Sequence, residues 1–394
     1  MMHTGCKRAA IRGKGKGIRL PMRVALVHDY LNQPGGAEHV VEVLHHLFPE
    51  APLFTSVYDR EAMPDFWRQV DVRTSFMQRI SPRLRVAKRL LPLYPYAFES
   101  LDLSGFDLVL SSCSTFSKGV ITPPRTLHVC YCHNTTRFLW MYHQYLAHER
   151  VGVLQHAVLW PMVTPLRAWD FQAAQRVDHF VANSRATANR IQKYYRRPSV
   201  VIEPPVRTAE FLGGDGSFDD AFLVVARLQS YKRIDLVVQA ATRLGIPLLV
   251  AGRGPDEARL RALSGPSVRF LGRVTNRERV RLMQHCAALV VPGREDFGLS
   301  TVEALAAGRP VLAYAAGGSL EIVVDGKTGA FFREPTAEAL EVAMRNFKPA
   351  AYDPAACRER ARHFDIATFG ERLRAHLDTL ITAHRSDGPL GGQV

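Results

Sequence analysis

The sequence predicts an α/β protein built from two doubly wound parallel sheets. Short continuous apolar runs recur along the chain, and runs of this length are typical of strands that are covered on both faces. Segments with helical apolar spacing separate the runs, and tandem prolines interrupt the pattern near residues 203–205. Strands alternating with helices form parallel sheets, so the interruption divides the chain into two such units.

The first unit opens with an apolar run at residues 23–28 and a Gln-Pro-Gly-Gly loop that ends in Gly35 and Gly36. Residues 37–47 then have helical spacing, so a strand, a glycine loop and a helix follow one another as at the start of an open α/β sheet. Further short apolar runs predict later strands of this unit, at residues 108–110, 128–130 and 179–182.

The second unit follows the proline-containing segment 202–206, and four apolar runs predict its strands, at residues 222–226, 247–251, 288–291 and 310–313. We therefore expect a first domain over residues 22–203 and a second over 204–363. A helix at residues 364–384 is expected to pack back on the first domain, and residues 385–394 are expected to form a disordered tail.

The composition is that of a folded, basic protein. Hydrophobic residues make up 47% of the 394 residues, which excludes a disordered chain, and the net charge is +14. Such an excess favours an anionic partner: nucleic acid, a membrane surface or a phosphorylated ligand. Residues 1–21 carry six cations and no acid, and we expect a flexible tail there. No run of 18 apolar residues occurs, so no membrane-spanning helix is expected.

One basic stretch stands apart, because residues 79–98 contain no acid and alternate cations with apolar side chains. Such a segment can lie in the headgroup region of an anionic leaflet. It can equally be a surface helix that packs on its own domain, and the composition does not separate these two interpretations. The cations of the predicted membrane patch are Arg79, Arg83, Arg85, Lys88 and Arg89.

Polar residues follow the predicted strands at the edge where open α/β sheets bind ligands. Gly35 and Gly36 precede the first helix, whose N-terminus can bind an anion. Arg227 and Lys232 come after the first strand of the second unit and before another helix, at residues 235–244. Two fixed cations beside a helix N-terminus favour a diphosphate ligand.

The strongest local signal is the block from residue 292 to 310, in which Glu295 and Glu303 bracket a glycine-containing loop after a strand. One carboxylate can face the hydroxyls of a sugar, and the other, on the helix that opens near Leu299, can reach a ribose. A second glycine loop, with Gly317 and Gly318, follows the next strand.

Motifs of several other protein classes are absent. No strand is followed by G-x-G-x-x-G or G-x-x-x-x-G-K-[ST], which argues against a dehydrogenase or a P-loop NTPase. The six cysteines include one C-x-C pair, Cys130 and Cys132, and no second pair that would complete a zinc site, so we expect reduced, buried thiols of a cytosolic protein. The sequence also lacks a nucleic-acid signature, which argues against a nucleic-acid partner.

Taken together, these motifs resemble the retaining glycosyltransferases of family 4. The family has the GT-B fold, in which two Rossmann-like domains face an interdomain cleft, and the resemblance runs over nearly the whole chain from Met22. The spacings Glu295-x7-Glu303 and Arg227-x4-Lys232 carry it. The other matching segments are Gly35-Gly36, A-G-R-G-P at 251–255, F-L-G at 270–272 and Gly317-Gly318.

The resemblance implies a role for each matching position. Arg227 and Lys232 would hold the diphosphate of a nucleotide-sugar donor, Glu303 its ribose and Glu295 its sugar. The resemblance places four side chains at the catalytic centre, and they are Arg227, Lys232, Glu295 and His133. The remaining positions of the implied donor site contact base, sugar or phosphate, and they are Gly36, Gly272, Val274, Phe297, Gly298 and Leu299.

Within the family, the chain is most similar to bacterial GDP-mannose-dependent mannosyltransferases of surface-polysaccharide assembly. The S-Y-K-R-I-D run at residues 230–235 contributes to that narrower match. An acceptor or phosphate side is implied at Gly35, His133 and Arg137. Those relatives often read C-H-T-P where this chain has Asn134 after the histidine, so the acceptor side is expected to differ in shape.

The resemblance implies transfer of mannose from GDP-mannose, with retention of configuration, onto a polyprenyl-diphosphate-linked oligosaccharide in exopolysaccharide or O-antigen assembly. No two of the 19 aspartates lie two positions apart, so the metal-binding D-x-D is absent and we expect transfer without a metal or other cofactor. The expected location is the cytoplasmic face of the inner membrane, on an anionic surface. The donor could instead be a UDP-sugar or another GDP-sugar, and the protein could be a sugar-nucleotide epimerase of the same fold. A phosphorylase or a catalytically inactive scaffold would share the fold, but the intact pairs Glu295/Glu303 and Arg227/Lys232 argue against them.

Overall fold

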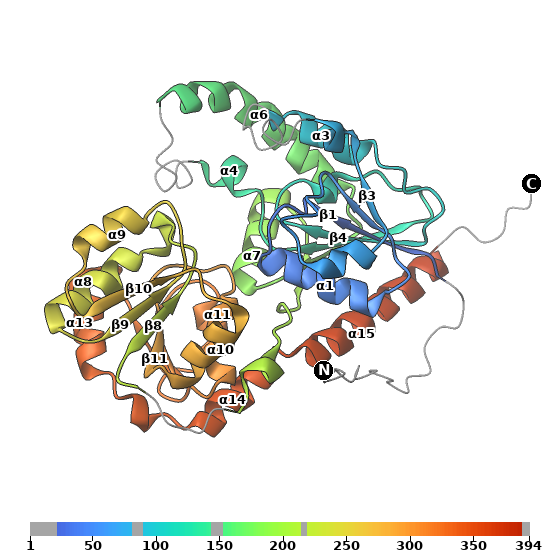
Figure 1. Ribbon diagram of the computed structural model, residues 1–394. Helices are drawn as coiled ribbons and strands as arrows, with labels where there is room; N and C mark the ends of the chain where they lie inside the picture. The colour runs from blue at the N-terminus through green and yellow to red at the C-terminus, as the bar shows by residue number, and fades with distance from the viewer. Residues whose placement is uncertain (1–21, 81–89, 143–152, 214–218, 388–394) are drawn as a thin grey trace, which may run out of the picture.

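The computed structural model describes residues 22–80, 90–142, 153–213 and 219–387, and it contains two α/β domains (Figure 1). Each domain is organised around one parallel sheet. The first sheet has seven strands in the order β3-β2-β1-β4-β5-β6-β7, and the second has six in the order β10-β9-β8-β11-β12-β13. The predicted fold class, two doubly wound parallel-sheet domains, is therefore confirmed.

All strand pairings within the two sheets are parallel. The strands of the first sheet are β1 (Val24–His28), β2 (Leu53–Thr55), β3 (Val72–Thr74), β4 (Leu108–Cys113), β5 (Leu127–Cys132), β6 (His179–Ala182) and β7 (Ser199–Val201). Those of the second are β8 (Phe222–Val225), β9 (Leu248–Ala251), β10 (Val268–Gly272), β11 (Ala288–Val291), β12 (Val311–Tyr314) and β13 (Gly329–Phe332).

Helices connect the strands and cover both faces of each sheet (Figure 1). In the first domain they are α1 (Gly36–Leu47), α3 (Leu93–Glu99), α4 (Arg137–Trp140), α6 (Val153–Gln175) and α7 (Arg185–Arg190). In the second domain they are α8 (Ile234–Leu244), α9 (Glu257–Leu263), α10 (Asn276–His285), α11 (Leu299–Ala306), α12 (Ser319–Ile322), α13 (Ala337–Asn346) and α14 (Pro354–Arg362). The long C-terminal helix is α15 (Ile366–Asp387).

Shorter helical turns sit mainly in the loops: η1 (Asp65–Gln69), η2 (Phe76–Arg79), η4 (Ser117–Gly119), η5 (Ile191–Tyr195), η6 (Thr208–Phe211), η7 (Ser230–Lys232) and η8 (Pro349–Ala351).

Burial explains why the apolar runs become strands. Every residue of β4 and β5 is buried, and separate apolar clusters cover the two faces of each sheet. A strand enclosed on both faces gains from burying each of its side chains, so no polar residues need to alternate with apolar ones. The same burial places the polar loops at the carboxyl edge of each sheet.

The chain crosses between the domains twice. After β7 it passes into the second domain, and after α14 it returns, so that α15 lies along the first domain (Figure 1). The two crossings touch, because the Val206 amide donates to the carbonyl oxygen of Phe364 at 2.8 Å. Phe369, Leu373 and Leu377 of α15 then join the apolar core beside α1.

Several sequence-based expectations fall outside the described residues. The basic tail over residues 1–21 lies outside them, as do residues 388–394 and four cations of the predicted membrane patch, Arg83, Arg85, Lys88 and Arg89. Arg79 is described, and it is exposed at the end of η2. Among the described helices, none combines the length and the apolar character needed to cross a membrane.

Candidate active site

The predicted site residues of the two domains gather where the carboxyl edges of the sheets face each other. Gly36 opens α1 in the first domain, and Leu299 opens α11 in the second. A Cβ atom added to Gly36 would lie 2.9 Å from Leu299 Cδ1, so these two helix N-termini meet across the domain boundary. Two helix N-termini facing one space favour an anion between them.

Lys232 and Glu295 lie together in the second domain, although 63 positions separate them in the chain. The Lys232 ammonium group donates to both carboxylate oxygens of Glu295, and both side chains are mostly buried. Lys232 ends η7, after β8, and Glu295 follows β11, which is the strand next to β8 in the sheet. The sheet order therefore brings the predicted phosphate-binding cation and the predicted sugar-binding carboxylate into direct contact.

Arg227 lies at the same sheet edge, after β8. Burial raises the pKa of Tyr30, which follows β1, and the Arg227 charge acts on it in the opposite direction. Burial lowers the pKa of Arg137, with a smaller contribution in the same direction from Arg227. The guanidinium of Arg227 is thus near enough to residues of the other domain to act on them electrostatically.

Glu303 lies on α11 and is 7% exposed. Its carboxylate accepts a hydrogen bond of 2.8 Å from Nη1 of Arg279, which lies on α10. Burial raises the pKa of Glu303, and the Arg279 charge opposes that rise. Arg279 was not among the residues singled out from the sequence, and the only available signal was its place near the start of a capped helix.

Two glycines shape the loop that carries Glu295. Gly298 has a φ of +106°, which L side chains adopt with difficulty, and this turn lets α11 begin immediately after the loop. Gly318 lies so close to the loop that a Cβ atom there would come within 2.1 Å of the Phe297 carbonyl oxygen. The glycine loop after β12 therefore supports the backbone around Glu295. The Phe297 ring is buried and packs against Phe364, so only its backbone remains for a ligand.

The predicted base-contacting positions lie at the end of β10. Gly272 closes the strand with a φ of +70°, and its carbonyl oxygen accepts from the Gly252 amide at 2.7 Å. Val274 follows two residues later, just before the Thr275 cap of α10. The strand order puts β10 two strands from β8 and three from β11, so these residues lie closer to the loop of Arg227 than to that of Glu295.

His133 follows β5 and sits at the carboxyl edge of the first sheet. Its Nε2 atom lies 2.8 Å from the hydroxyl of Ser112, in β4. Burial, together with the charge of the nearby His28, lowers the pKa of His133 to about 3. The imidazole is therefore neutral at physiological pH, which fits a hydrogen-bonding role better than that of a cation.

Arg137 contacts the other domain directly. Its guanidinium pairs with Asp296, the residue after Glu295, and lies over the ring of Tyr231 at 5.8 Å. Asp296 also accepts from Asn134 at 2.8 Å and from Arg190 at 2.6 Å. One carboxylate of the second domain thus binds three side chains of the first.

Sequence reasoning did not single out Asp296 or Arg190. It noted Asn134 as a departure from the C-H-T-P pattern, and in the structure this amide spans the domain boundary. No local pattern signals such a contact, since the partners are 162 positions apart in the chain.

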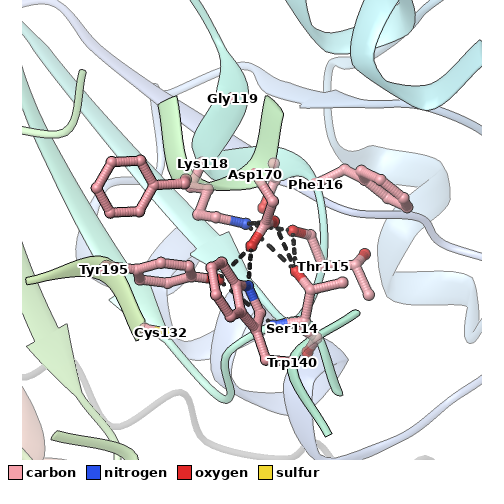
Figure 2. Close-up of polar contacts among 12 residues, drawn as sticks. Ser114, Thr115, Phe116, Lys118, Gly119, Cys132, Trp140, Asp170 and Tyr195 are labelled. Atoms are coloured by element: carbon pink, nitrogen blue, oxygen red, sulfur yellow. Dashed lines mark hydrogen bonds and ion pairs between the residues drawn. The ribbon is translucent and has the colours of Figure 1, made fainter. Parts of the chain in front are cut away.

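A buried ion pair supports the loops of the first domain (Figure 2). The Lys118 ammonium group pairs with Asp170 of α6, and both side chains are at most 1% exposed. Asp170 also accepts from Thr136, Trp140 and Tyr195, at 2.8, 2.6 and 2.9 Å. These bonds tie the loops after β4 and β5 to α6, and so they hold the segment that carries His133.

Asp29, directly after β1, performs a similar task for the loop after β4. Its carboxylate accepts four backbone amide hydrogens, at 2.6 to 2.9 Å, from consecutive residues of the loop at positions 114–117. A carboxylate bonded this often fixes the loop, and with it the end of β4 next to His133.

Neither cysteine of the C-x-C pair shows a metal site. Both are buried at the end of β5, and burial raises the pKa of each thiol. Within the described ranges, no group of three or more His, Cys, Asp or Glu side chains is arranged to hold a metal ion.

Comparison with protein families assigns both domains. Residues 34–210 match the model described as Glycosyltransferase Family 4, and residues 217–364 match Glycosyl transferases group 1. A pair of facing parallel-sheet domains with these matches defines the GT-B class. The chain belongs to the GT-B glycosyltransferases, of the family 4 type.

Solved structures agree on the fold. The chain is similar to sucrose-phosphate synthase from Thermosynechococcus elongatus, with a TM-score of 0.68 and 18% identity over 92% of this chain and 100% of that one. It is also similar to Anabaena Alr3699/HepE in complex with UDP, with a TM-score of 0.63 and 18% identity over 91% of this chain and 100% of that one.

Curated relatives match over shorter stretches. D-rhamnosyltransferase WbpZ of Pseudomonas aeruginosa is 33% identical over 132 residues, which cover 32% of this chain and 35% of the relative. D-inositol 3-phosphate glycosyltransferase of Mycobacterium sp. (strain KMS) is 30% identical over 63% of this chain and 66% of its own length. The chain thus spans between about one third and two thirds of these relatives.

Proposed function

We propose that the protein transfers a sugar from a nucleotide-sugar donor to an acceptor, with the donor bound on the second domain. The observation that carries this proposal is the contact between Lys232 and Glu295, beside Arg227 and opposite the N-terminus of α1. A donor diphosphate can take over the ammonium group of Lys232 from Glu295. The freed carboxylate can then accept hydrogen bonds from sugar hydroxyls.

Breaking the bond between the anomeric carbon and the diphosphate builds negative charge on the leaving oxygen. Arg227, Lys232 and the N-termini of α1 and α11 offer positive charge and amide donors at one place. Removing one preorganised donor of this kind costs about 3–4 kcal/mol of transition-state stabilisation. We further propose that configuration at the anomeric carbon is retained and that no metal takes part.

For the donor we propose GDP-mannose, and for the acceptor a polyprenyl-diphosphate-linked oligosaccharide of exopolysaccharide or O-antigen assembly. The S-Y-K-R-I-D run at residues 230–235 supports this donor through the family resemblance. UDP-glucose is the second candidate, because Anabaena Alr3699/HepE, which has a similar fold, is solved with UDP and with UDP-glucose.

A panel of nucleotide sugars tests the donor proposal. GDP-mannose, GDP, UDP-glucose and UDP are each added to the full chain, and the midpoint of thermal unfolding is recorded. A ligand that binds only the folded state raises this midpoint, and the stabilisation grows with the logarithm of the ligand concentration above Kd. We expect the largest rise with GDP-mannose. A larger rise with UDP-glucose selects the second candidate, and no rise with any of the four contradicts a nucleotide-sugar enzyme.

The reaction itself is tested with the donor that binds and a lipid-linked acceptor. Retention predicts a product whose anomeric configuration, read from NMR coupling constants, equals that of the donor. Independence from metals predicts unchanged turnover after dialysis against EDTA. An inverted product or a chelator-sensitive rate contradicts the corresponding part of the proposal.

We also propose that the protein lies on the cytoplasmic face of the inner membrane, where lipid-linked acceptors are reached from the cytoplasm. Replacing Arg85, Lys88 and Arg89 together by alanine is expected to abolish co-sedimentation with anionic vesicles at low salt. A matched control removes three exposed cations of the second domain, Arg277, Arg281 and Lys327, and should leave co-sedimentation unchanged. An equal loss of co-sedimentation in both variants would show that vesicle binding depends on net charge alone and would contradict the membrane patch.

A further inference from the structure

A row of four polar side chains leads from α1 to His133: Glu38, His28, Ser112 and His133 itself. The first three have no role in the proposed sugar transfer. Glu38 Oε1 lies 3.7 Å from Nε2 of His28, the last residue of β1. Nδ1 of His28 lies 3.1 Å from the Ser112 carbonyl oxygen and 3.2 Å from the Ser112 hydroxyl. That hydroxyl lies 2.8 Å from Nε2 of His133.

The sheet itself aligns this row. His28 and Ser112 are direct partners in the parallel pairing of β1 with β4, and β5, which His133 follows, is the next strand. His28 is 1% exposed and Ser112 is fully buried. Their relative positions are thus set by backbone pairing and enclosed by the core.

The positions of the hydrogens in the row follow from the Ser112 carbonyl oxygen, because this group can only accept a hydrogen bond. A carbonyl oxygen only accepts, so Nδ1 of His28 must carry a hydrogen where it meets the Ser112 carbonyl. The hydroxyl of Ser112 can accept from the same Nδ1, and its own hydrogen is then available for the other neighbour. That neighbour is Nε2 of His133. As an acceptor it takes the Ser112 hydrogen, whereas an Nε2–H would leave this buried hydroxyl hydrogen without a partner among the described hydrogen bonds.

This assignment does not depend on the charge of His28. Burial lowers the pKa of His28, but the hydrogen bond and charge of Glu38, together with the charge of Asp29, outweigh burial and raise it. Nδ1 carries a hydrogen in both the neutral form required here and the imidazolium form. The ring of His133, in contrast, is kept neutral by burial, which lowers its pKa to about 3.

We propose that Ser112 and His28 are positioning residues that hold His133 in the tautomer with its hydrogen on Nδ1. A neutral imidazole whose Nε2 accepts from Ser112 presents Nδ1–H as a donor and has no free basic nitrogen. His133 then donates a hydrogen bond to a sugar hydroxyl and takes no proton from the acceptor. The choice of ligand in this statement rests on the proposed function; the tautomer does not.

The tautomer is read directly by NMR of the full chain with ¹⁵N-labelled histidine, using His133→Gln to assign the signals. We expect the His133 ring between pH 6 and 8 to show a protonated Nδ1 and an unprotonated Nε2. A protonated Nε2, or a ring that titrates within this range, overturns the proposal. The measurement requires no substrate, so it stands whether or not the proposed function holds.

The positioning role is tested with Ser112→Ala and a matched control, Ser117→Ala. The hydroxyl of Ser117 is equally buried and donates to the same Ser112 carbonyl at 2.9 Å, but none of the described hydrogen bonds joins it to His133. We expect Ser112→Ala to convert the His133 signals to a mixture of tautomers and Ser117→Ala to leave them unchanged. Unchanged signals in Ser112→Ala, or equal changes in both variants, overturn the role of Ser112.

His28→Gln tests the next position in the row, because the glutamine amide can still donate to Ser112. We expect it to retain the His133 tautomer, whereas His28→Leu shifts it. A shift of equal size in both variants would show a packing effect and contradict positioning by hydrogen bonding.

Turnover completes the test once a donor is known. We expect Ser112→Ala to lower kcat about tenfold with little change in KM, and His133→Gln, which keeps a neutral donor, to retain more activity than His133→Ala. If no nucleotide sugar is turned over by the unaltered protein, the proposed function fails while the tautomer assignment is judged by NMR alone. If His133→Gln is no more active than His133→Ala, the donor role is wrong.

Discussion

The two domains use charge in opposite ways near the sheet edges that face each other. On the second domain, Lys232 pairs with Glu295 and Arg279 with Glu303, at the carboxyl edge of the sheet where a ligand can replace one partner. On the first domain, the pair of Lys118 and Asp170 is fully enclosed, and Asp170 also accepts hydrogen bonds from Thr136 and Trp140. In the second domain, the charged side chains are thus placed where a ligand can bind them. In the first domain, the charged pair fixes the positions of loops.

The largest expected effect tests the enclosed pair. Lys118→Met leaves the Asp170 carboxylate buried without its counter-ion, which typically costs 3–5 kcal/mol of unfolding free energy. All four tryptophans lie in the first domain, so fluorescence during urea unfolding follows that domain. The double variant Lys118→Met/Asp170→Asn should recover part of the loss. A loss below about 1 kcal/mol in the single variant would contradict a structural role for the pair.

The second-largest expected effect is a loss of activity when the pair of Lys232 and Glu295 is broken. Lys232→Ala is expected to lower kcat/KM by about 10²–10³-fold, because it removes a charge from the leaving diphosphate. The fold should be unaffected, since the pair lies at the edge of the sheet rather than in the core. Radiolabelled donor measures turnover, and Lys327→Ala, which removes an exposed lysine of the same domain, is the control. Normal turnover in Lys232→Ala would refute the diphosphate assignment.

A pH effect sharpens the contrast, because the first domain also buries neutral histidines. His128 is fully buried, bonds the Ser111 hydroxyl at 2.9 Å, and has its pKa lowered to about 3 by burial and by Arg176. A histidine with a lowered pKa in the folded state stabilises the fold above pH 6.5 and loses this contribution as the pH falls toward 3. At pH 5, His128 alone should cost about 2 kcal/mol.

His128→Gln should therefore make the decline in stability between pH 7 and pH 5 shallower by about this amount, about 2 kcal/mol. The same tryptophan signal measures it, with His46→Gln, at an exposed position on α1, as the control. A decline of the same steepness in His128→Gln and the unaltered protein would show that His128 does not titrate as burial requires.

The smallest expected effect comes from weakening the contact that Asp296 makes between the two domains. Asp296→Asn weakens the bonds to Asn134, Arg137 and Arg190, and we expect about tenfold faster amide exchange in the loop around Asp296, equivalent to about 1.4 kcal/mol. Asp325→Asn, at an exposed position of the same domain, is the control. Unchanged exchange would mean that other contacts hold the domains together.

The sequence predicts the strands that form uninterrupted apolar runs of their own and misses β2, β3, β7, β10 and β13. β3 and β7 have three residues each, and β10 contains an arginine and a glycine, so none of them forms the uninterrupted apolar run that marks a buried strand. They add to the edges of sheets whose centres are already defined. Edge strands are recognised by their neighbours rather than by their own residues.

The same limit applies to the site. Arg227, Lys232 and Glu295 could be grouped from sequence, because the carboxyl ends of neighbouring parallel strands share one edge. The contacts of Asp296 with the first domain could not, since they depend on how two separately folded domains meet. Lys118 and Asp170 were also missed: a buried ion pair leaves no periodic pattern, and its partners lie 52 positions apart.

The paired crossings at Val206 and Phe364 determine how the two domains can move. A single linker would let one domain swivel about it, but two backbone segments hydrogen-bonded side by side resist torsion and leave bending as the easy motion. A bend about that line would change the separation of α1 and α11 more easily than their relative rotation. The same two segments therefore limit the orientations in which Gly36 of α1 can meet Leu299 of α11.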